Sequence, residues 1–383
     1  MATIAYINGK VLQHGEFKQG LAVVVAGSSI EDIVPVAELT RKKYEIIDLG
    51  GNYLLPGFVD IQVNGGGGVL LNDSPDLEGV KTIASAHQQF GTTGLLPTLI
   101  SDDLEVISKG LAAVSEAIEV GVPGVLGIHI EGPFLNLDRR GIHDASKIRQ
   151  LTREIIAGLE PLKTGCTLIT IAPETVEPEL VRQLSEKGFI ICAGHTNASY
   201  EEASVAIDNG ISGFTHLYNA MSQLSAREPG VVGAAFDHDE TWCGIIADGH
   251  HVSPASLRTA YRCKGADKLM LVTDAMPPVG STENEFYLLG NRITVRDGVC
   301  IDANGTLAGA ALDMISAVRI MKEATDCGLA EASAMASASP AAFLGLQGSI
   351  GTVEPGLRAD FVIANEQLEV IQTIISGETV WPA

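Results

Sequence analysis

Four apolar runs in this sequence each lead into a residue that can bind a metal ion or accept a proton. Residues 125–130 precede Glu131, residues 188–194 precede His195, residues 211–215 precede His216, and residues 268–273 precede Asp274. In a barrel of parallel strands, side chains at the carboxyl ends of different strands converge on one face, so residues far apart in sequence can meet there. We therefore interpret these four residues as parts of one catalytic site.

A carboxylate and two histidines form the predicted metal centre. Gly132 and Pro133 end the strand directly after Glu131 and leave its carboxylate at the rim, where a cation or a base must neutralise it. Imidazole is the commonest neutral metal ligand, and a set of two histidines and one glutamate leaves positions open for water and substrate. Taken singly, Glu131 could form a cap or an ion pair, and His195 and His216 could be structural residues. Their joint pattern favours the metal site.

Asp274 is the predicted general base and then general acid. A carboxylate beside an activated water can accept its proton and later return that proton to a leaving group. An aspartate here could instead cap a helix or orient a histidine. The next residues, 275–280, read AMPPVG and cannot continue as a helix. The strand-end position that Asp274 shares with the predicted ligands favours the catalytic role.

The middle of the chain, residues 54–349, alternates apolar runs with amphipathic segments. Eight runs are predicted as strands: 58–64, 94–100, 124–130, 166–172, 189–194, 213–216, 242–247 and 268–273. Continuous apolar strands that alternate with helices are typical of a parallel sheet buried on both faces. An open doubly wound sheet is the competing architecture, but it lacks support because no GxGxxG lies between a strand and a helix. The pattern predicts an α/β fold, a TIM-like (β/α)8 barrel that forms the metal-dependent catalytic domain.

Both ends of the chain are rich in short strand-like runs with glycine and serine punctuation. Residues 1–53 show this character, and residues 350–383 repeat it. Spacing of this kind is typical of antiparallel hairpins. We therefore expect a small β-sandwich domain built from both termini, beside a barrel domain of residues 54–349.

Composition limits the class of partner and the location. The 25 Lys and Arg against 47 Asp and Glu give a formal net charge of −22, which repels nucleic acid and anionic membranes. No run approaches the roughly 20 apolar residues that cross a bilayer, and the N-terminus lacks a secretory pattern. The six cysteines are scattered without a CxxC pair, which favours buried free thiols. We expect a cytoplasmic protein with a small-molecule substrate.

The motifs around these residues resemble a known enzyme family along nearly the whole chain. The segments QVNGGGG, HIEGPFLN, GIHD, AGHTNAS, THLYNAM, REPG, IIADGHHV and LVTDAMPP occur in the order seen in N-acetylglucosamine-6-phosphate deacetylases of the amidohydrolase superfamily. The resemblance implies hydrolysis of the acetamide of N-acetylglucosamine 6-phosphate to glucosamine 6-phosphate and acetate. N-acetylgalactosamine 6-phosphate is the alternative substrate, because no motif reads the one hydroxyl by which the two sugars differ.

The resemblance also implies the cofactor. Many amidohydrolases carry His-x-His at the end of the first barrel strand, whereas this chain has Gln62 and Asn64 there, whose amides are poor ligands for transition metals. We therefore expect one divalent ion per subunit, held by Glu131, His195 and His216. Zinc is the preferred ion, with iron, cobalt or manganese as alternatives and a second, weaker metal left open.

Further site residues follow from the same resemblance. It implies that His143 polarises the acetyl carbonyl and that Leu307, Ala308 and Gly309 form a loop closing over the substrate near the acetyl methyl. The expected substrate-binding residues are Gln62, Asn64, Asn219, Ala220, Arg227, His251, Leu307, Ala308 and Gly309. A guanidinium suits phosphate because it is planar and always charged, although an isolated arginine is more often a solvated surface residue. The resemblance further implies a homodimer.

Two rival functions remain open at this point. A metal-dependent deaminase or cyclic amidase on the same fold would usually keep His-x-His and would have no use for a phosphate site at Arg227. A barrel that lost its chemistry and serves as an interaction protein would not be expected to retain Glu131, His195, His216 and Asp274 together.

Overall fold

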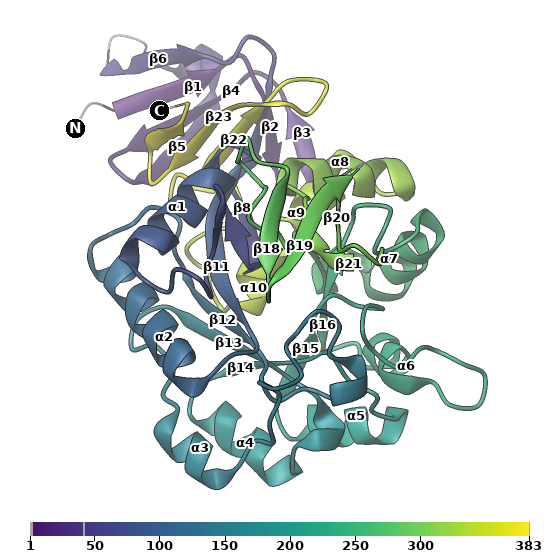
Figure 1. Ribbon diagram of the computed structural model, residues 1–383. Coiled ribbons are helices and arrows are strands. Elements are labelled where there is room, and N and C mark those ends of the chain that lie inside the picture. The colour runs from purple at the N-terminus through teal and green to yellow at the C-terminus, as the bar shows by residue number, and fades with distance from the viewer. Residues whose placement is uncertain (1–2, 41–42, 297, 306, 383) are drawn as a thin grey trace.

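A sheet of eight parallel strands forms the centre of the molecule (Figure 1). The computed structural model describes residues 3–40, 43–296, 298–305 and 307–382. The sheet order is β17-β16-β15-β14-β13-β12-β11-β8. The strands are β8 (Phe58–Val63), β11 (Thr92–Ile100), β12 (Gly127–Glu131), β13 (Cys166–Ile171), β14 (Ile190–Ala193), β15 (Ile211–Phe214), β16 (Trp242–Ile246) and β17 (Leu269–Val272). All eight predicted strands are therefore confirmed, and they neighbour one another in chain order.

The sheet closes on itself between its first and last strands. A parallel bridge joins Val63 to Ala275, and the Asp274 N–H donates to the Gln62 carbonyl at 3.0 Å. Every residue of β8, β11 and β12 is buried, because each of these strands packs on the barrel interior with one face and on surrounding elements with the other. The predicted TIM-like barrel is the observed fold.

Helices follow most barrel strands and cover the outside of the barrel (Figure 1). They are α1 (Leu77–Gln88), α2 (Leu104–Glu119), α3 (Arg153–Gly158), α4 (Pro178–Glu186), α5 (Tyr200–Asp208), α6 (Gly230–Asp237), α7 (Pro254–Lys268), α8 (Met314–Ala324), α9 (Leu329–Met335) and α10 (Ala338–Phe343). Local sequence fixes several starts: Ser199 and Glu202 form a capping box at α5, and Asp76 caps α1. Within the described ranges, no helix combines the length and apolar character needed to cross a membrane.

The two ends of the chain build two further sheets beside the barrel (Figure 1). One has the order β5-β4-β1-β6 and the other β24-β23-β22-β7-β2-β3. Their strands are β1 (Thr3–Ile7), β2 (Lys10–Gln13), β3 (Glu16–Lys18), β4 (Leu21–Ala26), β5 (Ser29–Pro35), β6 (Glu45–Asp48), β7 (Tyr53–Pro56), β22 (Phe361–Ala364), β23 (Val370–Ile375) and β24 (Glu378–Trp381). Strand β7 pairs with β2 on one side and β22 on the other, so both termini share one sheet that reaches to residue 56. The division into domains at 53/54 and 349/350 stays a prediction.

A four-stranded antiparallel sheet lies over the barrel mouth and was not predicted. It contains β18 (Glu285–Leu288), β19 (Asn291–Arg296), β20 (Val299–Ile301) and β21 (Leu307–Ala310). A small ribbon, β9 (Gly65–Gly66) with β10 (Val69–Leu70), lies at the glycine-rich segment after β8. The expected loop at residues 307–309 is thus a strand, held because the Ala310 N–H donates to the Asp274 carbonyl and Ala310 bridges Ala275.

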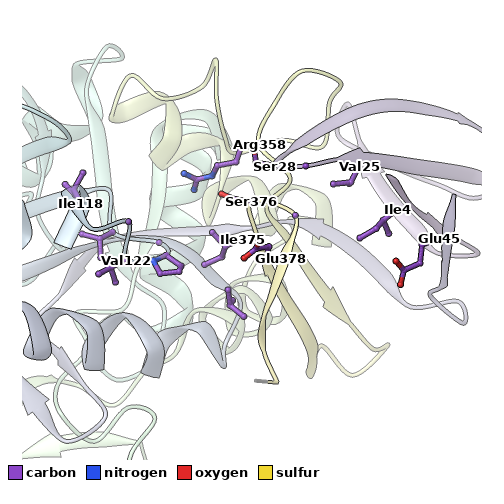
Figure 2. Close-up of a pocket in the computed structure, with 17 residues that line it drawn as sticks. Ile4, Val25, Ser28, Glu45, Ile118, Val122, Arg358, Ile375, Ser376 and Glu378 are labelled. Carbon is purple, nitrogen blue, oxygen red and sulfur yellow. The ribbon is translucent and has the colours of Figure 1, made fainter. Parts of the chain in front are cut away.

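A hollow of about 890 Å³ lies where the terminal sheets meet the loop after α2 (Figure 2). Ile4 and Val122 line it from opposite sides, and Glu45, Arg358 and Glu378 add charge. The Arg358 guanidinium already donates to the buried Asp360 carboxylate at 2.7 Å. None of the predicted site residues is among those that line this hollow, so the chemistry has to be sought at the barrel mouth.

Candidate metal centre and active site

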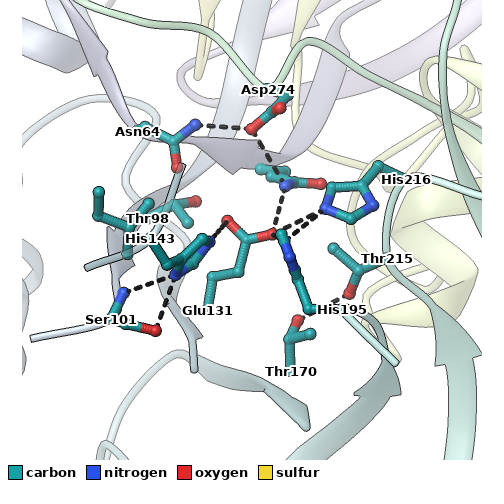
Figure 3. Close-up of polar contacts among 12 residues, drawn as sticks. Asn64, Thr98, Ser101, Glu131, His143, Thr170, His195, Thr215, His216 and Asp274 are labelled. Atoms are coloured by element: carbon teal, nitrogen blue, oxygen red, sulfur yellow. Dashed lines mark hydrogen bonds and ion pairs between the residues drawn. The ribbon is translucent and has the colours of Figure 1, made fainter. Parts of the chain in front are cut away.

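The four strand-end residues do meet at the carboxyl face of the barrel (Figure 3). Glu131 is the last residue of β12, and His195, His216 and Asp274 each lie two residues beyond their strand. These last three have φ of +49°, +32° and +50°, in the left-handed region that side chains other than glycine seldom adopt. Backbone strain of this kind persists where the surrounding structure enforces it, and it clusters at functional sites.

Three atoms from three strand ends form a compact triangle. Glu131 Oε1 lies 3.2 Å from His195 Nε2 and 3.1 Å from His216 Nε2, and the two nitrogens are 3.0 Å apart. All three side chains are buried. Among the residues that the structure describes, this is the one group of three or more His, Cys, Asp or Glu side chains placed to hold a metal ion.

The donor chemistry of the triangle fits a divalent cation. His195 Nδ1 lies 2.8 Å from the Arg139 carbonyl, so Nδ1 carries the proton and Nε2 presents its lone pair. A carboxylate oxygen and two imidazole nitrogens in mutual contact repel one another unless a proton or a cation lies between them. A tetrahedral zinc ion with bonds of about 2.0–2.1 Å keeps its ligand atoms about 3.3 Å apart, close to the sides of this triangle.

Glu131 is charged in this setting. Burial by itself would raise its pKa, but without a cation His195 and His216 can carry protons on Nε2, and their hydrogen bonds and charges then hold the pKa of Glu131 well below its usual value. Gln62 Nε2 also donates to Glu131 Oε1 at 3.0 Å. The carboxylate is thus available as an anionic ligand across the neutral pH range.

Asp274 faces the triangle from the last strand of the barrel. Gln62 Nε2 and Asn64 Nδ2 both donate to its Oδ1, at 3.1 and 2.7 Å, which leaves Oδ2 for another partner. Burial, and next the charge of Glu131, raise the pKa of Asp274 to about 6. A carboxylate whose pKa lies near neutrality can both take and return a proton.

His143 presents an N–H toward Glu131. The Ser101 N–H donates to His143 Nδ1 at 3.1 Å, so in the neutral ring the proton is on Nε2, which lies 4.0 Å from Glu131 Oε2. The Ser101 hydroxyl lies 2.7 Å from the same Nδ1. Burial lowers the pKa of His143 to about 3, so the ring stays neutral and keeps this donor. The contact with Ser101, which directly follows β11, was not predicted from the sequence.

These groups line one cavity of about 220 Å³ at the barrel mouth. The predicted residues that line it are Asn64, Glu131, His143, His195, His216, Asn219, Ala220, His251, Asp274, Leu307 and Gly309. Apolar residues that sequence reasoning missed complete the wall, among them Ile100, Ile142, Ile246 and Met276. The cavity therefore combines a polar floor of metal-binding type with an apolar side.

Three predicted substrate contacts lie outside this lining. Gln62 is buried behind it and acts on Glu131 and Asp274. Ala308 is fully buried in the core of the β18–β21 sheet, because neighbouring residues of a strand face opposite ways. Arg227 is exposed on the segment between β15 and α6.

His251 is held by an aspartate that was not predicted. Its Nδ1 lies 2.6 Å from Asp248 Oδ2, while Asp248 Oδ1 accepts the backbone N–H groups of His250 and His251, both at 2.8 Å. Burial opposes ionisation, but His251 and these N–H groups hold the pKa of Asp248 below its usual value. The signal was present in the sequence, because Asp248 precedes His251 by three residues in the same motif.

Comparison with known proteins agrees with this site. The profile of the Amidohydrolase family matches residues 53–380. The N-acetylgalactosamine-6-phosphate deacetylase of Shewanella sp. (strain ANA-3) is 44% identical over 98% of this chain and 95% of its own length. The N-acetylglucosamine-6-phosphate deacetylase of Haemophilus influenzae is 36% identical over 98% of both chains.

A solved structure shows the same architecture. The crystal structure of N-acetylglucosamine-6-phosphate deacetylase from Pasteurella multocida superposes with a TM-score of 0.95 at 35% identity, over 98% of this chain and 99% of that one. Family profile, relatives and structure thus agree over nearly the full length. The chain belongs to the amidohydrolase family and, within it, to the N-acetylhexosamine-6-phosphate deacetylases.

Proposed function

We propose that this protein hydrolyses the acetamide of an N-acetylhexosamine 6-phosphate to acetate and the free amino sugar phosphate. The observation that carries the proposal is the triangle of Glu131, His195 and His216, which opens onto the same cavity as Asp274. A divalent ion held by this triangle would polarise the acetyl oxygen and make a water acidic enough to attack at neutral pH.

Asp274 handles the proton in this scheme. Its Oδ2, free of the amides that hold Oδ1, takes the proton of the attacking water. The protonated carboxyl then gives that proton to the amide nitrogen, so that the C–N bond breaks with the neutral amine as leaving group. The amides of Gln62 and Asn64 keep the carboxyl in one orientation for both steps.

His143 and the apolar wall orient the acetyl group. The neutral His143 donates its Nε2–H to the acetyl oxygen as negative charge develops there, where one lost donor can cost on the order of 3 kcal/mol. Met276, Leu307 and Gly309 offer the apolar side of the cavity to the methyl group. Asn219 and Ala220, which also line the cavity, are proposed sugar contacts.

His251 and Arg227 are the proposed phosphate contacts, from two different subunits of a homodimer. His251 lines the cavity of its own chain, whereas Arg227 is exposed and does not line it. Leu224, a neighbour of Arg227, is an exposed apolar residue of the kind found in interfaces. We propose that Arg227 enters the cavity of the partner subunit.

Zinc is the proposed ion, supported by a set of one carboxylate and two imidazoles in near-tetrahedral spacing, with iron, cobalt and manganese as alternatives. A cytoplasmic location is proposed as well, supported by six cysteines that are all free. Metal analysis of protein purified without added metal tests the first of these proposals.

The galacto epimer is a second candidate substrate, favoured by the higher identity to the Shewanella relative. The test is acetate release by the metal-loaded protein from both 6-phosphorylated epimers and from their unphosphorylated forms. We expect turnover of the phosphosugars alone, with kcat/KM naming the preferred epimer. Equal turnover of unphosphorylated sugars would contradict the phosphate contacts, and absence of turnover on all four would contradict the proposed function.

A further inference from the structure

Four buried threonines lie on alternate strands directly below the metal-binding triangle. Thr98 is on β11, Thr170 on β13, Thr215 directly after β15, and Thr273 directly after β17. Their exposed fractions are 0, 0, 4 and 0%. A barrel interior is filled by layers of four side chains from alternate strands, usually Val, Ile or Leu. We call this set the threonine layer. Apolar side chains would fill the same space, so packing alone does not explain why these four residues are polar.

Three threonines of the layer, Thr98, Thr170 and Thr215, are labelled in Figure 3 and form a row of contacts with His129. Thr215 Oγ1 lies 2.7 Å from Thr170 Oγ1, which lies 2.8 Å from His129 Nε2. His129 Nδ1 lies 3.5 Å from Thr98 Oγ1, at the long limit of such a contact. The row therefore spans four of the eight strands at the depth of the site.

The direction of the row follows from the number of protons available. Thr98 donates its one hydroxyl proton to the Leu96 carbonyl at 3.1 Å, so it can only accept from His129. His129 Nδ1 then carries the ring proton, and Nε2 accepts from Thr170. Thr170 in turn accepts from Thr215. Thr170 is the one hydroxyl that both donates and accepts within the row. Its loss would therefore leave the groups on both sides of it without a hydrogen-bond partner.

A glycine makes the central contact possible. Thr170 and Thr215 lie on either side of β14, whose next residue is Gly194. A Cβ at Gly194 would lie 2.7 Å from Thr170 Cγ2 and 2.9 Å from Thr215 Cβ, which is too close for real atoms. Because Gly194 has no side chain, the hydroxyls of Thr170 and Thr215 can approach each other at this point.

Each predicted metal ligand has a near neighbour in this arrangement. His129 precedes Glu131 by two residues and faces the same way, Thr215 directly precedes His216, and Gly194 directly precedes His195. We propose that the threonine layer, with Thr170 at its centre, is a positioning device that fixes the spacing of the three ligands. The proposal rests on the metal site of the proposed function. Mutation of residues that support metal ligands in this way typically changes metal affinity 10- to 100-fold.

Thr170→Val, Thr170→Ser and Thr167→Val test this role. Valine keeps the shape of Thr170 but removes the hydrogen-bond partner of His129 Nε2 and of the Thr215 hydroxyl. Serine keeps the hydroxyl. Thr167 is the matched control: it lies on the same strand, is 2% exposed, and its hydroxyl accepts the Leu162 N–H at 2.9 Å away from the site. The readouts are the rate of metal release to excess chelator and the thermal midpoint of the metal-free protein.

We expect Thr170→Val to release metal about 10- to 100-fold faster than wild type, with Thr170→Ser close to wild type. Thr167→Val should lower the thermal midpoint without changing the release rate. Gly194→Ala should speed release although it removes no hydroxyl. A wild-type release rate in Thr170→Val, or equal acceleration in Thr167→Val, would overturn the positioning role alone. Wild-type protein that takes up no divalent ion would instead overturn the proposed function.

Discussion

At Asp274, two side-chain amides donate to the same oxygen atom, and among the residues that the structure describes no group donates to the other. In the proposed mechanism this asymmetry would separate two tasks of the carboxyl group: Oδ1 fixes its orientation and Oδ2 moves the proton. Gln62 and Asn64 occupy the first-strand position at which the resemblance leads one to expect His-x-His, as in many amidohydrolases. With Gln62 and Asn64 in place of two histidines, this position would be a poor site for a second metal ion. The two amides orient the Asp274 carboxyl group instead.

Replacing Asp274 by asparagine tests that division. Asp274→Asn keeps the size of the side chain but cannot accept a proton, so kcat should fall by about 10²–10⁴-fold. Metal content should remain near one ion per subunit, because Glu131, His195 and His216 are untouched. Acetate release and elemental analysis of the same sample measure both quantities. A parallel loss of metal would mean that Asp274 is a ligand rather than the proton carrier.

Asp248 controls the proposed phosphate contact from behind. In Asp248→Asn the neutral amide binds His251 more weakly, and we expect KM for the phosphosugar to rise about 10-fold, the loss of one charge-assisted hydrogen bond. The kcat should change little, because the phosphate lies far from the bond that breaks. His250→Asn is the matched control, since His250 is exposed and does not line the cavity. An equal drop in kcat with constant KM would place Asp248 in the chemical step instead.

Among the elements, the closure between β8 and β17 depends on a buried carboxyl group. Thr273 Oγ1 donates to Asp60 Oδ2 at 2.6 Å, and the N–H groups of Gln62 and Thr273 approach Asp60 Oδ1. Burial raises the pKa of Asp60 from 3.8 to about 7 despite these donors. The first and last strands are therefore joined through a group that is harder to ionise in the folded barrel than in the unfolded chain.

This shift predicts a pH-dependent stability. Between about pH 4 and pH 7 the unfolded chain loses the Asp60 proton while the folded chain keeps it, so the free energy of unfolding falls as pH rises. Asp60→Asn should remove a fall in the free energy of unfolding on the order of 4 kcal/mol from this window. Urea unfolding of metal-free wild type and variant from pH 4 to 8 measures the difference. Asp208→Asn, at the exposed end of α5, is the control and should follow wild type.

Sequence patterns predicted the eight barrel strands but not the β18–β21 sheet over the barrel mouth. The eight strands were recognisable because burial on both faces demands continuous apolar runs, as in β8 and β11. The β18–β21 sheet was missed because its strands are half exposed and interrupted by polar residues, as in Asn291–Arg296. Leu307 and Gly309 were assigned to the correct cavity from resemblance but to a loop, since only the pairing with the Asp274 segment makes them a strand.

For the site, residue types at strand ends were enough to name the triangle and Asp274. The contact of Ser101 with His143 was not predictable, because it joins two segments that only the fold brings together. Asp248 was overlooked although it lies three residues before His251 in the same motif. The exposure of Arg227 could not be predicted either, since a sequence motif does not indicate whether a side chain lies in the site of its own subunit or of another.

At the scale of the whole molecule, a protein of net charge −22 has to bind a dianionic sugar phosphate. Its average field opposes that ligand, so local cations must overcome it. Among the described residues, His251 is the one basic side chain that lines the cavity besides the proposed metal ligands and the neutral His143. This shortage is consistent with a second subunit that supplies Arg227.

Mixing two defective variants tests the exchange of Arg227. In a homodimer of the proposed kind, Arg227→Ala and Asp274→Asn subunits that reassort at random should restore about a quarter of the sites, because each mixed dimer contains one intact site. Acetate release after unfolding and refolding the variants together measures this recovery, with each variant treated alone as control. Activity no higher than the sum of the separate variants would show that Arg227 does not cross over.

The β18–β21 sheet is fastened to the segment that carries the catalytic acid. The Ala310 N–H donates to the Asp274 carbonyl and the Met276 N–H to the Ala310 carbonyl, both at 3.0 Å. If this sheet moved away from the barrel mouth as a rigid body, these hydrogen bonds would break and Asp274 would be displaced at every turnover. We therefore expect substrate to enter and product to leave past Asn219 and His251, while the β18–β21 sheet stays in place throughout the cycle.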